Sequence, residues 1–126
     1  MAFEKVILAR IEAGQASGVP VAWAIAPRNS SLPRVVCWTI TGTFDLSIDA
    51  PSGLRTATVQ VDCWGSSYNE VRVIADAVLA SLHGWTDIAQ KIHGVFLEGT
   101  RDGDLETDID DRVFRISQDF AGVFFV

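Results

Sequence analysis

Residues 55–64 read Arg-Thr-Ala-Thr-Val-Gln-Val-Asp-Cys-Trp and form the clearest strand pattern in the chain. Small or apolar side chains alternate with polar ones, which predicts a strand with one face in the core and the other in water. The upstream segment 34–43 is rich in Val, Ile, Thr and Trp and predicts a second strand. The ten residues 44–53 predict a loop, so the two strands are expected to form an antiparallel hairpin.

The same alternation predicts which side chains of the hairpin face the core. The expected core residues are Val36, Trp38, Ile40, Val59, Val61 and Cys63. This register places Cys37 on the face opposite to Cys63. We therefore predict two free thiols.

Two segments have the spacing of amphipathic helices. In residues 3–13 apolar side chains recur every three or four positions, and Gly14 ends the pattern. In residues 68–82 a buried stripe is predicted, and Ser67 and Glu70 are spaced as a capping box. Gly84 is the expected stop. The predicted stripe consists of Val71, Ile74, Ala75, Val78, Leu79 and Leu82.

Three further segments, 21–26, 92–99 and 112–126, predict strands. In the last of them Phe114, Ile116 and Phe120 share a face. The apolar end Val-Phe-Phe-Val at 123–126 predicts either a central strand or a strand covered by a neighbouring subunit. The order α-β-β-β-α-β-β predicts an α+β fold in a single domain, 1–126: a mostly antiparallel sheet of four to five strands with two helices packed on it.

Composition and motifs argue against several function classes. Ten basic and sixteen acidic residues give a net charge of −6, and the sequence has no cluster of Lys and Arg that could bind the phosphates of nucleic acid. No apolar run is long enough to span a membrane, and no signal peptide is recognisable, so we expect a soluble protein made in a cytoplasm. Phosphate-binding loops and nucleophile elbows are missing. We expect no enzymatic activity and no cofactor.

An acidic run provides the strongest candidate for a metal site. Asp102, Asp104, Glu106, Asp108 and Asp110 occupy every second position, so an extended chain would project all five carboxylates to one side. The calcium loop of EF-hands requires glycine at its sixth position, where this chain has Thr107. A solvated hairpin connection is the favoured interpretation, and no metal is expected.

Several of these segments together resemble a known family. They are Leu-Pro-Arg-Val-Val at 32–36, Ile-Thr-Gly at 40–42, Pro-Ser-Gly-Leu at 51–54, residues 57–65, Tyr68 with Glu70, Ile-Ala-Asp-Ala-Val at 74–78, and residues 112–120. The chain is similar, over nearly its whole length, to the tail-completion or tail-terminator proteins of long-tailed bacteriophages, which also occur in prophages and gene transfer agents. Arg34 stands where the family usually has an aromatic residue, and the polar residues that often follow the last strand are missing.

The resemblance implies a non-enzymatic virion protein of the tail or neck, assembled in a bacterial cytoplasm. It implies a ring, with six subunits expected, at the head-proximal end of the tail tube. Such a ring ends tube polymerisation and joins the tail to the head connector. The implied partners are further copies of the chain, the major tail tube protein and a connector or stopper protein, with DNA passing through unbound.

Candidate contact residues follow from this picture. A ring needs two different patches on each subunit. The expected contacts with a neighbouring subunit or the tube are Phe44, Leu46, Ile48, Arg55 and Trp64. For Trp64, packing under a helix is an equal alternative. A channel for DNA favours acidic walls, and the expected lumen-facing residues are Asp45, Asp49, Asp102, Asp104, Glu106 and Asp108.

Two other interpretations stay open. The first is another tail or neck component, such as a tube-like protein that grows rather than stops. The second is a small cytosolic enzyme or ligand-binding domain, which requires a concave pocket with convergent polar groups. Nothing in the sequence points to such a pocket.

Overall fold

The computed structural model describes residues 2–15, 19–23, 33–46, 51–102 and 114–125. Its elements, in chain order, are α1 (Ala2–Gly14), β1 (Val21–Trp23), β2 (Arg34–Leu46), β3 (Pro51–Gly65), α2 (Tyr68–Leu82), β4 (Trp85–Asp87), the short 3₁₀ helix η1 (Ile88–Gln90), β5 (Ile92–Asp102) and β6 (Phe114–Phe125). Neither α-helix of these described segments is long and apolar enough to cross a membrane.

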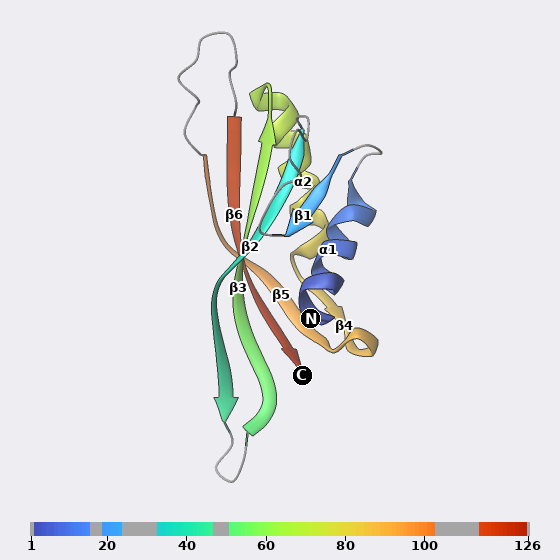
Figure 1. Cartoon of the computed structure of the whole chain (residues 1–126), viewed down its shortest axis with the longest axis vertical. Helices are drawn as coiled ribbons and strands as arrows, with labels where there is room; N and C mark the ends of the chain where they lie inside the picture. Colours follow the sequence, from blue (N-terminus) through green and yellow to red (C-terminus); the bar gives the residue numbers. More distant parts are fainter. Residues whose placement is uncertain (1, 16–18, 24–32, 47–50, 103–113, 126) are drawn as a thin grey trace.

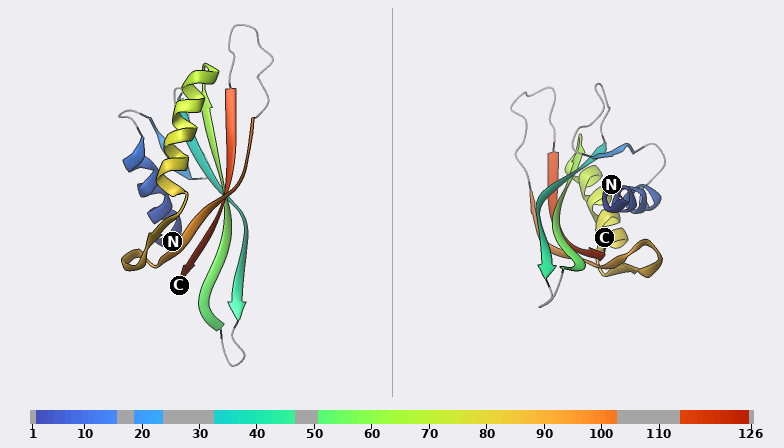
Figure 2. Two further views of the ribbon diagram at one scale, coloured as in Figure 1. Left: turned by 180° about the vertical axis from the view of Figure 1, so that it is seen from behind. Right: turned by 60° about the horizontal axis from the view of Figure 1, so that its bottom comes forward.

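The strands form one twisted sheet with both helices on the same face (Figures 1 and 2). The strand order is β1-β2-β3-β6-β5-β4. Among the strands of the described ranges, β1 and β2 pair in parallel and the other neighbours pair antiparallel. The α+β class, the two helices and the antiparallel β2–β3 hairpin are therefore confirmed. Four to five strands were expected, and the described residues form six, because Trp85–Asp87, too short to show an alternating pattern, pairs with β5.

The core lies between the helices and the central strands β3 and β6. These two strands pair from Leu54 with Phe125 to Gly65 with Phe114. Ile116 and Phe120 of β6 are fully buried, and Phe114 packs against the same cluster, as the shared face predicted. Of the two explanations for the apolar residues 123–125, the central strand is correct, because β6 lies between β3 and β5.

The predicted register of β2 is wrong. Val35 pairs with Cys63 and Cys37 pairs with Val61, so both cysteines face the helices. Trp38 lies on the opposite face with 42% of its surface exposed. The cause is that residues 35–38 are all apolar, so their alternation does not choose a face. The two thiols are free, as predicted, although not because they lie on opposite faces.

The loop predicted at 44–53 is shorter than expected because the two strands continue into it. Phe44 pairs with Arg55, and Leu46 pairs with Pro51. Pro51 is the first residue of β3, a position that proline tolerates because no ladder hydrogen bond is needed there. Similarly, β5 runs on to Asp102, into the segment predicted as a polar connection. Of the predicted strand 21–26, Val21–Trp23 is observed and the rest lies outside the described residues.

Helix α2 begins and ends as its sequence predicts. The Ser67 hydroxyl accepts a hydrogen bond from the Glu70 N–H at 3.2 Å, and the Glu70 carboxylate accepts one from the Ser66 N–H at 3.0 Å. Gly84, just past the helix, has a φ of +76°, which a residue with a side chain rarely adopts. The predicted stripe faces the core, with Leu79 at its margin.

Candidate assembly surfaces

The sheet face turned away from the helices, called the outer face below, is a candidate contact surface. Side chains alternate between the two faces of each strand, so the register defines its members. They are Arg34, Val36 and Trp38 on β2, Thr58, Gln60, Asp62 and Trp64 on β3, Arg115, Ser117 and Asp119 on β6, and Phe96, Glu98 and Arg101 on β5.

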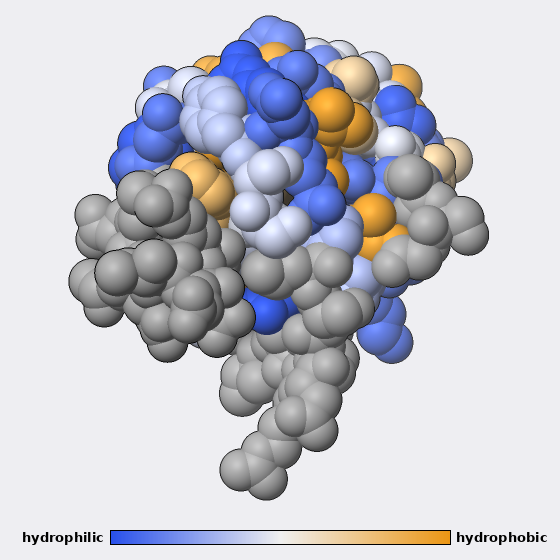
Figure 3. Space-filling view, turned by 90° about the horizontal axis from the view of Figure 1, so that it is seen from above, coloured by the Kyte–Doolittle hydropathy of each residue, from blue (hydrophilic) through white to orange (hydrophobic). Residues whose placement is uncertain are grey.

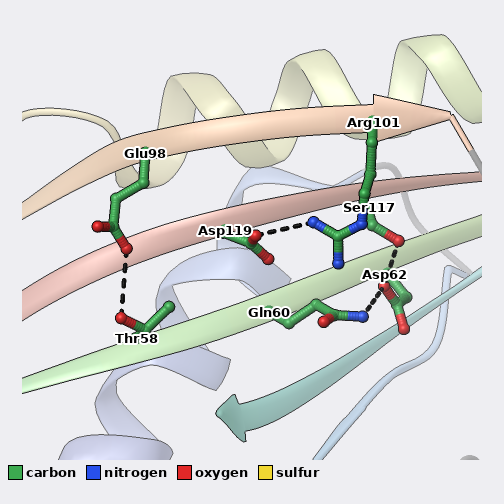
Figure 4. A network of polar contacts seen from close by, with 7 residues as sticks. All are labelled: Thr58, Gln60, Asp62, Glu98, Arg101, Ser117 and Asp119. Carbon is green, nitrogen blue, oxygen red and sulfur yellow. Dashed lines mark hydrogen bonds and ion pairs between the residues drawn. The ribbon is translucent and has the colours of Figure 1, made fainter. Parts of the chain in front are cut away.

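A hydrogen-bonded group around Asp62 occupies the middle of the outer face (Figure 4). One Asp62 carboxylate oxygen, Oδ1, accepts hydrogen bonds from the Ser117 hydroxyl at 2.6 Å and from the Gln60 amide at 2.8 Å. Asp62 is only 4% exposed and Ser117 is fully buried. Buried polar groups stabilise a fold only when their hydrogen bonds are made. This group therefore holds β3 to β6.

Replacing Asp62 with alanine should lower the free energy of unfolding by about 1–3 kcal/mol, because the buried Ser117 hydroxyl then loses its acceptor. In the Asp62→Ala background, Ser117→Ala should lower the free energy of unfolding by less than it does in the unmodified chain, because the hydroxyl that it removes no longer has an acceptor. Urea denaturation of the single and double variants measures this coupling. Thr58→Ala, which removes an exposed hydrogen bond to Glu98, is the control and should have little effect. Strictly additive losses would contradict the assignment.

Two ionic or polar contacts extend this face toward β5 (Figure 4). Arg101 and Asp119 form an ion pair with 2.8 Å between Nη1 and Oδ2. The Thr58 hydroxyl donates to Glu98 at 3.2 Å. Both contacts are exposed, so each contributes little to stability. They leave the outer face with charges of both signs.

Trp64, a predicted contact residue, lies half-buried on the outer face between two arginines. The guanidinium of Arg34 on β2 lies 5.4 Å from the centre of its ring, and that of Arg115 on β6 lies 5.2 Å from it. Both arginines stand directly opposite Trp64 in the register. A cation over an aromatic face is attracted by the ring electrons. Sequence reasoning missed this cluster because only the strand order brings the three residues together.

Three of the other four predicted contact residues lie in described strands. Phe44 and Leu46 belong to the end of the β2–β3 hairpin, and Arg55 is half-buried in β3. Ile48 lies outside the described residues. The hairpin end, at the bottom of Figure 1, extends beyond both helices. It is therefore open to contact with another subunit.

The predicted lumen-facing acids are separated in the fold. Asp45 belongs to β2 near the hairpin end, whereas Asp102 is exposed at the far end of β5. Asp49, Asp104, Glu106 and Asp108 lie outside the described residues. Within the described ranges, no group of three His, Cys, Asp or Glu side chains is arranged to hold a metal ion.

Neither cysteine is disposed to act as a nucleophile. Burial raises the pKa of Cys37 to about 12, with Asp62 contributing, and burial also raises the pKa of Cys63. A thiol attacks as its thiolate. Both side chains are thus protonated core groups at neutral pH.

Among the coloured residues in Figure 3, hydrophilic ones predominate and hydrophobic ones form small separate patches. The exposed large apolar side chains of the described residues include Ile88, Val73 and Phe96.

Comparison with known proteins identifies the class. The family model described as "Tail completion protein gp17" matches residues 8–124, and the chain belongs to this family. It is thus a structural component of a phage-type virion tail, and the resemblance found in the sequence is confirmed. A chain of the solved structure "Virion of native gene transfer agent (GTA) particle" has a similar fold, with a TM-score of 0.56 at 11% identity, covering 99% of this chain and 92% of that one. No curated protein matches the sequence significantly.

Proposed function

We propose that the chain is a tail terminator: a ring of six subunits at the head-proximal end of the tail tube, which ends tube polymerisation and joins the tail to the head connector. The proposed partners are further copies of the chain, the major tail tube protein and a connector or stopper protein. DNA would pass through the ring without specific binding. Family membership over residues 8–124 carries the proposal.

The end of the β2–β3 hairpin supports a role in contact with the tube or with a neighbouring subunit. Strand pairing persists to Leu46 and Pro51, so the hairpin is held in shape by its own backbone hydrogen bonds. A pre-shaped projection binds without first paying the entropy of ordering a flexible segment. Phe44 and Leu46 are the proposed apolar contacts at this end.

The function is tested by polymerising the tube protein of the same particle with and without the chain. We expect the chain to cap tubes at a limited length, with particles visible by negative-stain electron microscopy as rings. Its solution mass should approach six times the 13.7 kDa of one subunit. If the chain itself adds indefinitely to growing tubes, the tube-like alternative is correct. A monomer that neither caps nor joins tubes would overturn the proposal.

The double variant Phe44→Ser with Leu46→Ser should abolish capping of tubes while the chain stays folded, because it removes the proposed apolar contacts of the hairpin end. The matched control is Val73→Ser, on the outward side of α2, where the valine is 69% exposed. Tube-length distributions from electron micrographs measure both. If the two variants cap tubes equally well, the hairpin end does not make the proposed contact.

A further inference from the structure

Two strands of the sheet carry stretches that, among the described residues, pair with a strand on one side only. β1 covers β2 only from Val35 to Cys37, which leaves Trp38–Leu46, called the β2 edge below. β4 covers β5 only from Ile92 to Val95. Open strand edges present N–H and C=O groups that can pair with another chain.

The covered part of β5 ends at a defined point. The Gly84 N–H donates to the Val95 carbonyl at 2.7 Å, and the Leu97 N–H donates to the His83 imidazole, Nδ1, at 3.0 Å. His83 thus occupies the side of the strand where a partner would otherwise pair. The open stretch of this strand is therefore Glu98–Asp102, called the β5 edge below.

The two edges have the right polarity to meet. Direction alternates along β2, β3, β6 and β5, because each neighbouring pair is antiparallel. β2 and β5 consequently run in opposite directions on opposite sides of one sheet. The β5 edge of a second copy, placed beside the β2 edge of the first, would extend the same antiparallel alternation.

We propose that the β5 edge of one subunit pairs with the β2 edge of the next, so that the sheet continues from copy to copy. This inference rests on the proposed ring. A head-to-tail contact repeated around a closed ring leaves neither edge open, whereas pairing of two identical edges would stop at a dimer.

Exposed aromatic side chains mark both edges. Trp38 begins the β2 edge and is 42% exposed, and Phe96, just before the β5 edge, is 50% exposed. Both side chains belong to the outer face. At a junction between two subunits, the added strand would therefore lie beside an exposed aromatic side chain on that face. Gly94 lets the Phe96 ring lie back along β5, since a side chain at Gly94 would meet that ring at 2.8 Å.

Because β1 and β4 already pair with parts of β2 and β5, neighbouring subunits must be displaced relative to each other along the strands. β1 covers the beginning of β2, and β4 covers the beginning of β5, which lies at the other end of the sheet because the strands are antiparallel. Pairing the two open stretches therefore displaces each subunit along the strand direction. Closing a sheet into a barrel requires such a shift in register.

Cross-linking of mixed single-cysteine variants tests the proposal. One variant carries Thr41→Cys in the β2 edge, and the other carries Glu98→Cys in the β5 edge, both at positions of the outer face. A short bismaleimide linker should join them when the two are mixed and allowed to assemble, and neither variant should form linked dimers alone. The unmodified chain is the control, because Cys37 and Cys63 are buried.

The outcomes are distinct. Linked dimers of Thr41→Cys alone would show β2–β2 pairing and overturn the proposal. Rings that form without any mixed cross-link would overturn the edge pairing and leave the ring function intact. A chain that stays monomeric even with its tube partner would overturn both.

A second measurement does not depend on the cross-linker. Trp38→Ala and Phe96→Ala should each raise the concentration at which half of the rings dissociate by at least tenfold, measured by sedimentation velocity. Ile88→Ala, at an apolar residue 92% exposed in η1, is the control and should leave that concentration unchanged. No change in either aromatic variant would contradict the proposed junction.

Discussion

Replacing Phe120 with alanine is expected to lower the free energy of unfolding by about 3–5 kcal/mol, a large share of the stability of a domain this size. Phe120 is 1% exposed and is one of the largest fully buried side chains in the described core. It belongs to β6, between Val59 on β3 and Leu97 on β5. The cavity would therefore open at the centre of the sheet, where neighbouring strands hold the backbone and limit collapse.

Chemical denaturation followed by circular dichroism measures this loss, at a protein concentration where the chain is monomeric. Phe96→Ala, at the half-exposed phenylalanine on the neighbouring strand, is the matched control and should cost about 1 kcal/mol or less. Similar losses in the two variants would show that β6 is not at the centre of the core.

Alkaline pH is expected to destabilise the fold through the two buried thiols. An unfolded cysteine ionises near pH 9, whereas burial raises the pKa of Cys37 to about 12 and raises that of Cys63 in the same direction. Above pH 9 the folded state therefore holds protons that the unfolded state has lost. The free energy of unfolding should fall by about 1.4 kcal/mol per pH unit for each thiol, up to the folded pKa.

Below pH 9 both thiols are protonated in the folded and the unfolded state. The thiols therefore cause no loss of stability between neutral pH and pH 9. The control is the double variant Cys37→Ala with Cys63→Ala, in which the thiol-dependent slope should vanish. Other groups that titrate in the same range are common to both proteins and cancel in the difference. Parallel stability curves above pH 9 would contradict the burial of the thiols.

The sequence predicted those elements whose patterns are unambiguous. The alternation in residues 55–64 and the stripe and cap of α2 left a single interpretation, and the structure agrees with both. β2 shows the limit, because a run of apolar residues from Val35 to Trp38 fits either face, and only the neighbouring strands choose between them. The three-residue β4 is too short to carry a period at all.

The candidate surfaces were less predictable than the fold, because they depend on residues brought together across strands. The Asp62–Ser117 hydrogen bond and the pair of arginines around Trp64 need the order β2-β3-β6, which sequence patterns do not specify. The open edges likewise follow from where β1 and β4 stop. The family, in contrast, was recognisable from ordered motifs along the chain.

The central position of β6 has a consequence for the folding kinetics. β2 with β3, and β4 with β5, are each formed from segments close in sequence, and within the sheet β6 lies between these two pairs. The pairing of Leu54 with Phe125 and of Gly65 with Phe114 closes long stretches of chain. Non-local contacts of this kind slow folding, because the entropy of closing the chain is lost before the contacts stabilise the sheet. The protein should therefore fold more slowly than a helical bundle of the same length, because its central strand pairs with segments far away in the sequence.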